Sequence, residues 1–254
     1  MTEALSAATG LSGPTLLIMA AICFSAGLVR GFAGFALSAL VMASAVMLLP
    51  PVELIPICWV LEFTASILMF RGGLADADRR MVLILVVGSA IGMPVGLWLT
   101  TTLPVETSKV IALSLVVALA GLQLARIRLP GLATTHGTWI TGVAAGIVTG
   151  LAMIGGMMIA LYVLARDAPA RMMRASLVLF LFAGAFTTLV YLLLYGVMDQ
   201  RAAARGAVLA LPAALGVVLG KRLFVPRLEP WYRPVCLTLL IGLAATSLAR
   251  SALG

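Results

Sequence analysis

Charged residues are scarce in this sequence: Asp, Glu, Lys and Arg together make up only 10% of its 254 residues. A soluble domain carries about 25% charged residues, so the composition argues against a soluble protein. Hydrophobic residues account for 63% of the chain, and the mean hydropathy is +1.17. We therefore predict an all-α polytopic membrane protein that is embedded over almost its whole length. The net charge of +8 is then evidence on membrane topology rather than a sign of nucleic-acid binding.

Reactive and metal-binding side chains are also few. The only histidine, His136, lies in a polar connection, and the three cysteines (Cys23, Cys58 and Cys236) lie in apolar runs without metal-ligand spacing. The sequence contains no cluster of His, Asp and Glu and no phosphate-binding loop. These absences argue against an integral-membrane enzyme and exclude an ATP-driven pump from this chain alone, so we expect no catalytic residue, metal or cofactor. The first residues lack a basic segment, which argues against a cleaved signal peptide.

Apolar segments fill the chain in two sets of four. They are bounded near 14–49, 52–70, 81–102 and 106–125, and then near 137–165, 172–198, 203–220 and 234–249. The best matches between the sets are "AGLVRGFA" (26–33) with "AGIVTGLA" (145–152), and Gly92-x-x-x-Gly96 with Gly216-x-x-x-Gly220. Internal duplication is common in transporters, and such glycine pairs are typical of close helix packing. We predict two membrane repeats, residues 1–125 and 137–254, joined by a cytoplasmic linker at 126–136.

The first segment of each repeat is predicted to be interrupted. As one helix, the 36 residues of 14–49 would extend about 54 Å, whereas the hydrocarbon core is about 30 Å thick. The glycines around Gly31 and Gly34 are the expected break in the first repeat. In the second repeat the arm 156–165 is too short to span, since spanning requires about 20 residues. We therefore expect each repeat to open with a broken or re-entrant helix pair, followed by three spanning helices.

Lysine and arginine indicate how these segments cross the membrane. If each first segment crosses once, the connections on the two sides carry 8 and 8 basic residues; if each enters and returns, the counts are 12 and 4. The positive-inside rule favours the second arrangement. The connections 71–80, 126–136, 166–174 and 221–233 are then cytoplasmic, and both termini lie outside. Each repeat makes an odd number of crossings, so we expect the two repeats to have inverted topology.

Interrupted helices also predict a binding site. A helix that begins in mid-membrane presents free N–H groups and the positive end of its dipole, which together bind anions. Two such starts are expected, at Phe35–Ser38 ("FALS") and at Gly155–Met158 ("GGMM"), and in an inverted repeat they would meet near the midplane. The predicted substrate-binding residues are Arg30, Gly31, Gly34, Ser38, Thr64, Ser66, Thr149, Gly155, Gly156, Thr187 and Thr188. For the hydroxyl residues, bonding back to their own helix is the alternative.

Arg30 lies in an apolar segment at the expected break, where a charged side chain costs at least about 2.5 kcal/mol. Glu62, in "WVLEFTAS", is the natural partner. Three roles for Arg30 stay open: an ion pair with Glu62, binding of an anionic substrate, and extension of the side chain to the membrane surface. Glu62 has no acidic counterpart in the second repeat, where Ala185 stands, and it is a candidate for the ion pair or for proton coupling.

Two glycine-rich openings, "AGLVRGFAGFALSAL" and "AGIVTGLAMIGGMM", resemble those of the TauE/SafE family of sulfite and organosulfonate exporters. The resemblance covers nearly the whole chain and is supported by "GSAIGMPVGLWL" and "PAALGVVLGKRL". Where the family tends to show a run such as "GFGGG", this chain has Gly34, Phe35 and Ala36. The resemblance implies a small sulfur-containing anion such as sulfite, a sulfonate or sulfoacetate.

We therefore predict a secondary transporter that moves a small anion, of the kind that the resemblance implies, across the bacterial inner membrane. An anion channel with the same backbone site and a carrier of a non-sulfur carboxylate are the alternatives. The expected partners are the small anionic substrate and the lipid bilayer, with no nucleic acid. Assembly into a homo-oligomer stays open.

Overall fold

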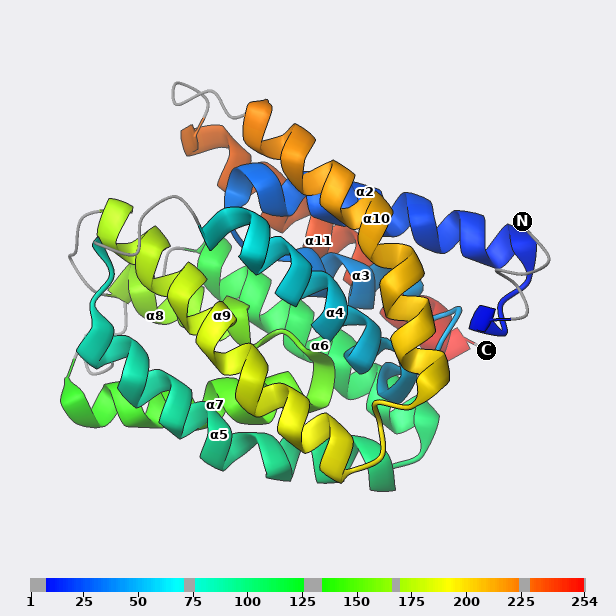
Figure 1. Cartoon of the computed structure of the whole chain (residues 1–254), viewed down its shortest axis with the longest axis horizontal. Helices are drawn as coiled ribbons and strands as arrows, with labels where there is room; N and C mark the ends of the chain where they lie inside the picture. The colour runs from blue at the N-terminus through cyan, green and yellow to red at the C-terminus, as the bar shows by residue number, and fades with distance from the viewer. Residues whose placement is uncertain (1–7, 71–75, 126–133, 166–169, 224–228, 254) are drawn as a thin grey trace.

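The described part of the chain consists of helices and their connections, without a strand (Figure 1). The computed structural model describes residues 8–70, 76–125, 134–165, 170–223 and 229–253, so most of the linker predicted at 126–136 lies outside it. The helices are α2 (Gly13–Ala33), α3 (Leu37–Ala45), α4 (Pro51–Phe70), α5 (Arg79–Thr102), α6 (Val105–Leu124), α7 (Thr135–Ala152), α8 (Gly155–Ala165), α9 (Ala170–Leu194), α10 (Gln200–Arg222) and α11 (Glu229–Leu253). Among the described residues, seven helices are long and apolar enough to cross a membrane, which confirms a multi-pass membrane protein.

Both first segments are interrupted by left-handed backbone. Helix α2 ends at Gly34, whose φ is +81°, and α3 begins after Ala36, whose φ is +73°. Helix α7 ends at Met153, whose φ is +57°, and α8 begins at Gly155. A residue in this conformation cannot continue a right-handed helix. The predicted breaks are confirmed, and they are equivalent, because Gly34 and Met153 are separated by the same 119 positions as the two matching openings.

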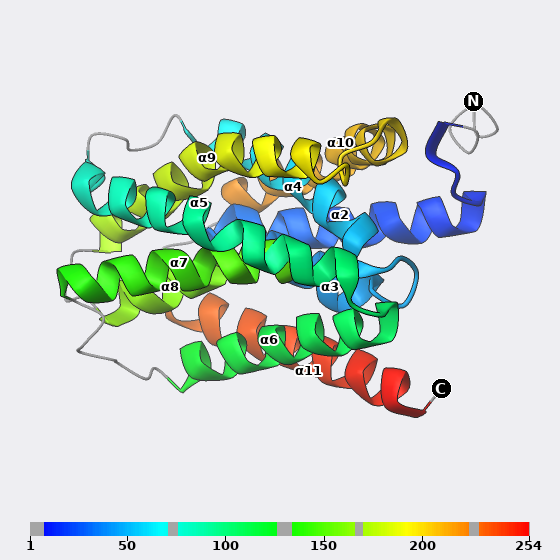
Figure 2. The same cartoon turned by 90° about the horizontal axis from the view of Figure 1, so that it is seen from below.

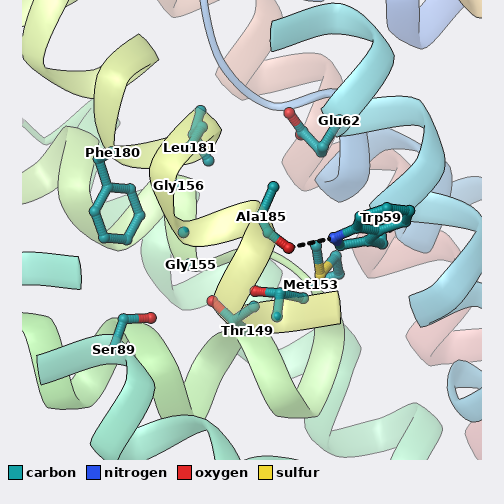
Figure 3. Close-up of a pocket in the computed structure, with 12 residues that line it drawn as sticks. Trp59, Glu62, Ser89, Thr149, Met153, Gly155, Gly156, Phe180, Leu181 and Ala185 are labelled. Carbon is teal, nitrogen blue, oxygen red and sulfur yellow. Dashed lines mark hydrogen bonds between the residues drawn. The ribbon is translucent and has the colours of Figure 1, made fainter. Parts of the chain in front are cut away.

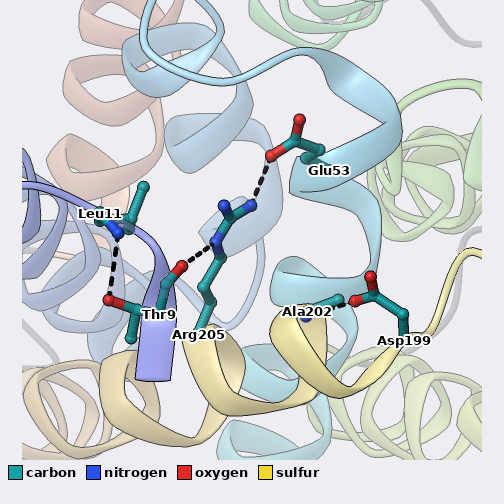
Figure 4. A network of polar contacts seen from close by, with 6 residues as sticks. All are labelled: Thr9, Leu11, Glu53, Asp199, Ala202 and Arg205. Atoms are coloured by element: carbon teal, nitrogen blue, oxygen red, sulfur yellow. Dashed lines mark hydrogen bonds and ion pairs between the residues drawn. The ribbon is translucent and has the colours of Figure 1, made fainter. Parts of the chain in front are cut away.

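Helices α2, α4 and α10 start at the same end of the molecule. Arg205, near the start of α10, donates from Nε to the carbonyl oxygen of Thr9 at 2.7 Å and pairs with Glu53 at the start of α4 (Figure 4). At the other end, Lys221 Nζ donates to the carbonyl oxygen of Leu68 at 2.9 Å. Because α2 and α4 begin at one end, the α2–α3 segment enters the protein and returns to the end where it started.

Helices α5, α7 and α9 start at the opposite end. The N–H of Asp78, the N-cap of α5, donates to the hydroxyl of Ser176 on α9 at 3.0 Å. Helices α5 and α7 lie parallel, since a Cβ at Gly88 would meet Gly142 and a Cβ at Gly96 would meet Ile147. The α7–α8 segment therefore also enters and returns, and α2 and α7 run in opposite directions (Figure 2).

Glycines allow these parallel helices to approach until their backbones touch. A Cβ at Gly92 or Gly96 would meet a carbonyl oxygen of α7. A Cβ at Gly216 or Gly220 would meet a carbonyl oxygen of α2 in the same way. The α5–α7 and α2–α10 pairs are thus packed by the same device, and the two glycine pairs occupy packing positions, as their spacing predicts.

The two short helices, α3 and α8, are packed among the longer ones. Helix α3 has 9 residues and α8 has 11, and both are largely buried. Each is held by a helix from the other half of the chain: Ser247 on α11 donates to the carbonyl oxygen of Ala43 at 2.8 Å, and Gln123 Nε2 on α6 donates to that of Met157 at 3.0 Å. A helix that ends inside the bilayer must be buried in protein, because its free backbone groups cannot be exposed to lipid.

Candidate functional site

A pocket opens beside the break between α7 and α8 (Figure 3). Residues of α4, α5, α7, α8 and α9 line it. Its polar side chains are Trp59, Glu62, Ser89, Thr149 and Thr188; the rest of the lining is apolar or glycine. The pocket therefore joins the second helix start to the one acidic side chain that the sequence places in mid-membrane.

The N-terminus of α8 contributes backbone to this pocket through Gly155 and Gly156. Among the residues that the structure describes, no acceptor receives a hydrogen bond from the N–H group of either glycine. The first N–H groups of a helix have no partner within the helix, and they carry the positive end of its dipole. The start of α8 thus offers two donors and a partial positive charge to a ligand.

Two hydroxyl groups of the pocket are also available as donors. Ser89 and Thr188 are 7% and 6% exposed, and neither hydroxyl has a partner in the described part of the chain. The hydroxyl of Thr149 differs, because it donates to a carbonyl oxygen one turn earlier on α7 at 2.6 Å. Trp59 is engaged as well, since Nε1 donates to the carbonyl oxygen of Ala185 at 2.8 Å (Figure 3).

The equivalent helix start in the first repeat is filled by a side chain of the protein itself. Ser38, in the first turn of α3, donates to Glu62 Oε1 from its N–H at 3.2 Å and from its hydroxyl at 2.9 Å. Glu62 Oε2 lies 3.4 Å from Nη2 of Arg30, which is completely buried. Nη1 of Arg30 donates to the carbonyl oxygen of Gly34 at 2.6 Å. A carboxylate thus rests on the N-terminus of α3 beside a buried cation, which is a favourable place for an anion.

The two matching halves of the sequence differ at the positions of this ion pair. Thr149 stands where the first repeat has Arg30, and Ala185 stands where it has Glu62. The start of α8 therefore lacks both the cation and the carboxylate, and Ala185 leaves space that belongs to the pocket. At α3 a carboxylate of the protein rests on the helix start, whereas the start of α8 borders the pocket.

The predicted site residues fall into three groups. Those that line the pocket are Glu62, Thr149, Gly155, Gly156 and Thr188. Those that form the adjacent ion-pair cluster, together with Glu62, are Arg30, Gly34 and Ser38. Those that lie in neither are Gly31, Thr64, Ser66 and Thr187.

The third group makes other contacts. Gly31 lies in the α2–α10 interface, where a Cβ would meet the carbonyl oxygen of Val217. Thr64 and Thr187 donate to carbonyl oxygens of their own helices at 2.8 and 2.9 Å, which is the alternative left open for hydroxyl residues. Ser66 is fully buried, and within the described residues its hydroxyl has no partner. These four residues have no direct access to a ligand in the pocket.

Ser89 and Trp59 line the pocket without having been predicted. Ser89 lies in "GSAIG", where the small residues indicate packing and give no sign that one hydroxyl faces a cavity. Trp59 precedes Glu62 by three positions, so the helical period puts both on one face of α4. This spacing is the sequence feature from which Trp59 could have been predicted to lie beside Glu62.

These observations define a class: a multi-pass membrane protein with two interrupted helices, in which one helix start borders a pocket and the other holds Glu62, which lines the same pocket; interrupted helices of this kind occur in secondary transporters. The family model described as "Sulfite exporter TauE/SafE" matches residues 19–247, and the chain belongs to this family. No curated protein and no solved structure matches the chain. The predicted family and a role in membrane transport are thereby confirmed.

Proposed function

We propose that this protein is a secondary transporter for a small sulfur-containing anion, which binds in the pocket at the N-terminus of α8. The main support is a set of four donors that have no acceptor among the described residues: the N–H groups of Gly155 and Gly156 and the hydroxyls of Ser89 and Thr188. A sulfite or sulfonate group carries three oxygen atoms around one sulfur, so it can accept from several directions at once. Helix starts of this kind bind anions without a basic side chain.

A carrier of a carboxylate and an anion channel are the competing functions. A carboxylate has two oxygen atoms in one plane, which suits a bidentate partner better than four donors from three helices. Membership of a family named for sulfite export also supports the sulfur-containing anion. A channel is distinguished by counterflow: a carrier accelerates entry of labelled sulfite into liposomes that are loaded with unlabelled sulfite, whereas a channel does not.

Gly156→Leu is expected to fill the pocket and weaken sulfite binding by about 100-fold, the equivalent of losing one to two charge-assisted hydrogen bonds. A Cβ at Gly156 would meet only the side chain of Leu181, at 3.1 Å, and this flexible neighbour can move. Gly155 is a poorer choice, because a Cβ there would meet the Thr149 hydroxyl and backbone of α7. The measurement is sulfite affinity of the purified protein in detergent, with thermal unfolding recorded in parallel.

The matched control is Gly121→Leu on α6, where a Cβ would meet nothing within 4 Å. It adds the same side chain to another glycine outside the pocket, so sulfite affinity should stay within about twofold of wild type. Normal affinity in a well-folded Gly156→Leu protein would exclude the pocket as the binding site.

We also infer an inverted repeat in a bacterial inner membrane, with both termini outside. The opposite directions of α2 and α7 and the 12-to-4 division of basic residues support it. Cysteines introduced at Arg79 and Arg201, both exposed, test it in a protein without native cysteines. An impermeant maleimide should label position 201 in intact cells and position 79 only after permeabilisation. Labelling of both positions from outside would rule out this topology.

A further inference from the structure

The carboxylate of Glu62 lies between the two helix starts. Its Oε1 accepts both hydrogen bonds from Ser38 on α3, while its side chain is 12% exposed and lines the pocket in front of α8. Figure 3 shows Glu62 on α4, apart from Gly155 and Gly156, which line the same pocket. A substrate anion at α8 would therefore share a cavity with a fixed negative charge. Like charges repel strongly where little water screens them, so one of the two charges must be neutralised or leave.

Arg30 provides one positive charge, and Glu62 does not satisfy its guanidinium. Nη1 is used by Gly34, whereas Nε and Nη2 donate no hydrogen bond within the described residues. Glu62 Oε2, at 3.4 Å from Nη2, likewise accepts none. Buried donors are almost always hydrogen-bonded. Nε has no acceptor among the described residues, and Nη2 has only the 3.4 Å ion pair with Glu62, so these two donors point to a second acceptor that reaches Arg30 in another state of the transport cycle.

Among the residues that the structure describes, one positive charge lies close enough to compensate that of Glu62. Arg30 on α2 faces the carboxylate, and α3 contributes no titratable side chain. The thiol of Cys58 lies one turn earlier on α4, with Cys23 on α2 nearby. The other charged or titratable side chains described on helices packed against α4 lie toward helix ends or bond elsewhere: Arg79, Arg80, Glu106, Lys109, His136, Tyr191, Arg201, Arg205, Lys221 and Arg222. Neutralising Glu62 while an anion is bound thus calls for a proton.

We propose that the ionised carboxylate of Glu62 occupies the anion-binding site at the N-terminus of α3, and that it leaves this site when it is protonated. A proton from water at the pocket mouth converts the carboxylate to a carboxylic acid, which loses its attraction for Arg30 and for the N-terminus of α3. The substrate anion then accepts hydrogen bonds from Ser38 and from Nε and Nη2 of Arg30. One proton and one anion move together. When both are released, the ionised Glu62 carboxylate again accepts from Ser38 and faces Arg30. This inference rests on the proposed function of the pocket.

The test compares sulfite binding by the full-length wild type, Glu62→Gln and Glu53→Gln between pH 6 and pH 10, under anaerobic conditions. Sulfite itself takes up a proton in this pH range, but this affects all three proteins equally. The difference in affinity between the proteins therefore reports on Glu62 alone. Where the carboxylate is ionised, linkage requires log Kd of wild type to rise with pH about one decade per pH unit more steeply than that of Glu62→Gln. Glu53→Gln removes a carboxylate from the end of the same helix and should follow wild type.

A second readout uses liposomes with a pH gradient. The gradient should accumulate sulfite through wild type and through Glu53→Gln, whereas Glu62→Gln should only equilibrate it. If Glu62→Gln does not fold, the double variant Arg30→Gln/Glu62→Gln is measured instead, because it leaves no unpaired buried charge at this site. Parallel pH profiles, or equal accumulation by wild type and variant, would overturn the proton-coupling role. Absence of saturable sulfite binding by wild type would instead overturn the proposed function of the pocket.

Discussion

Arg30→Gln alone is expected to lower the free energy of unfolding by about 3 kcal/mol, a large effect for one substitution in this chain. The change leaves the Glu62 carboxylate in the protein interior with no cation, and only Ser38 still donates to it. Adding Glu62→Gln removes the stranded charge, so the double variant should recover most of the loss. The measurement is denaturant or thermal unfolding in detergent for wild type, both single variants and the double variant.

The same four proteins separate the two roles of Arg30. If Arg30 serves only as the partner of Glu62, the stable double variant should bind and transport sulfite like wild type. If Arg30 also receives the substrate, the double variant should be stable but bind sulfite at least about tenfold more weakly than Glu62→Gln alone. We expect the second result. Arg30→Lys should recover little, because one ammonium group cannot replace a guanidinium that donates to Gly34 and faces Glu62 together. Full transport by the double variant would contradict a substrate role.

The interruptions could be predicted from the sequence because they follow from length. A 36-residue apolar segment is too long for the bilayer, and Gly34 supplies the residue that adopts left-handed backbone most readily. The return of each segment to its starting end followed from the basic residues, because topology is governed by few charges in short connections. These features depend on the chain and the membrane, not on which helices become neighbours.

Contacts between distant helices could not be predicted in the same way. Gly31 and Gly34 lie in one motif, yet only Gly34 has positive φ, while Gly31 meets the backbone of α10. The sequence pairs Arg30 with Glu62 by charge, but nothing in it shows that Glu62 also caps α3 through Ser38. The sequence therefore left substrate binding at the first helix start open beside the ion pair, and the structure shows the Glu62 carboxylate at that helix start.

The hydroxyl residues show the same limit at the scale of one helical step. Thr187 and Thr188 are adjacent and both were predicted to bind substrate. A helix turns by about 100° per residue, so neighbouring side chains face different surroundings. Thr188 lines the pocket, and Thr187 bonds to the carbonyl oxygen of Gly184. Without the position of α8, the sequence has no means to choose between them.

Ala185→Glu should abolish sulfite binding by giving the second repeat the carboxylate that the first repeat has. Ala185 lines the pocket at the position equivalent to Glu62, and its side chain is 6% exposed. A glutamate there can accept from the free N–H groups of Gly155 and Gly156, as Glu62 accepts from Ser38. A tethered acceptor competes at high effective concentration and repels a second anion, so we expect sulfite affinity to fall by about 100-fold or more.

Ala185→Gln separates charge from bulk, because glutamine has the same size and shape but cannot ionise. If only the bulk of the side chain matters, sulfite binding should weaken equally in both variants. If the negative charge matters, Ala185→Glu should bind sulfite at least about tenfold more weakly than Ala185→Gln at pH 8. Acidification should then close this gap, since a protonated glutamate resembles the amide. Sulfite affinities of the two variants, each compared with wild type between pH 5 and pH 8, give the answer. Equal affinities at pH 8 would mean that the start of α8 does not select for negative charge, and the anion would have to bind elsewhere.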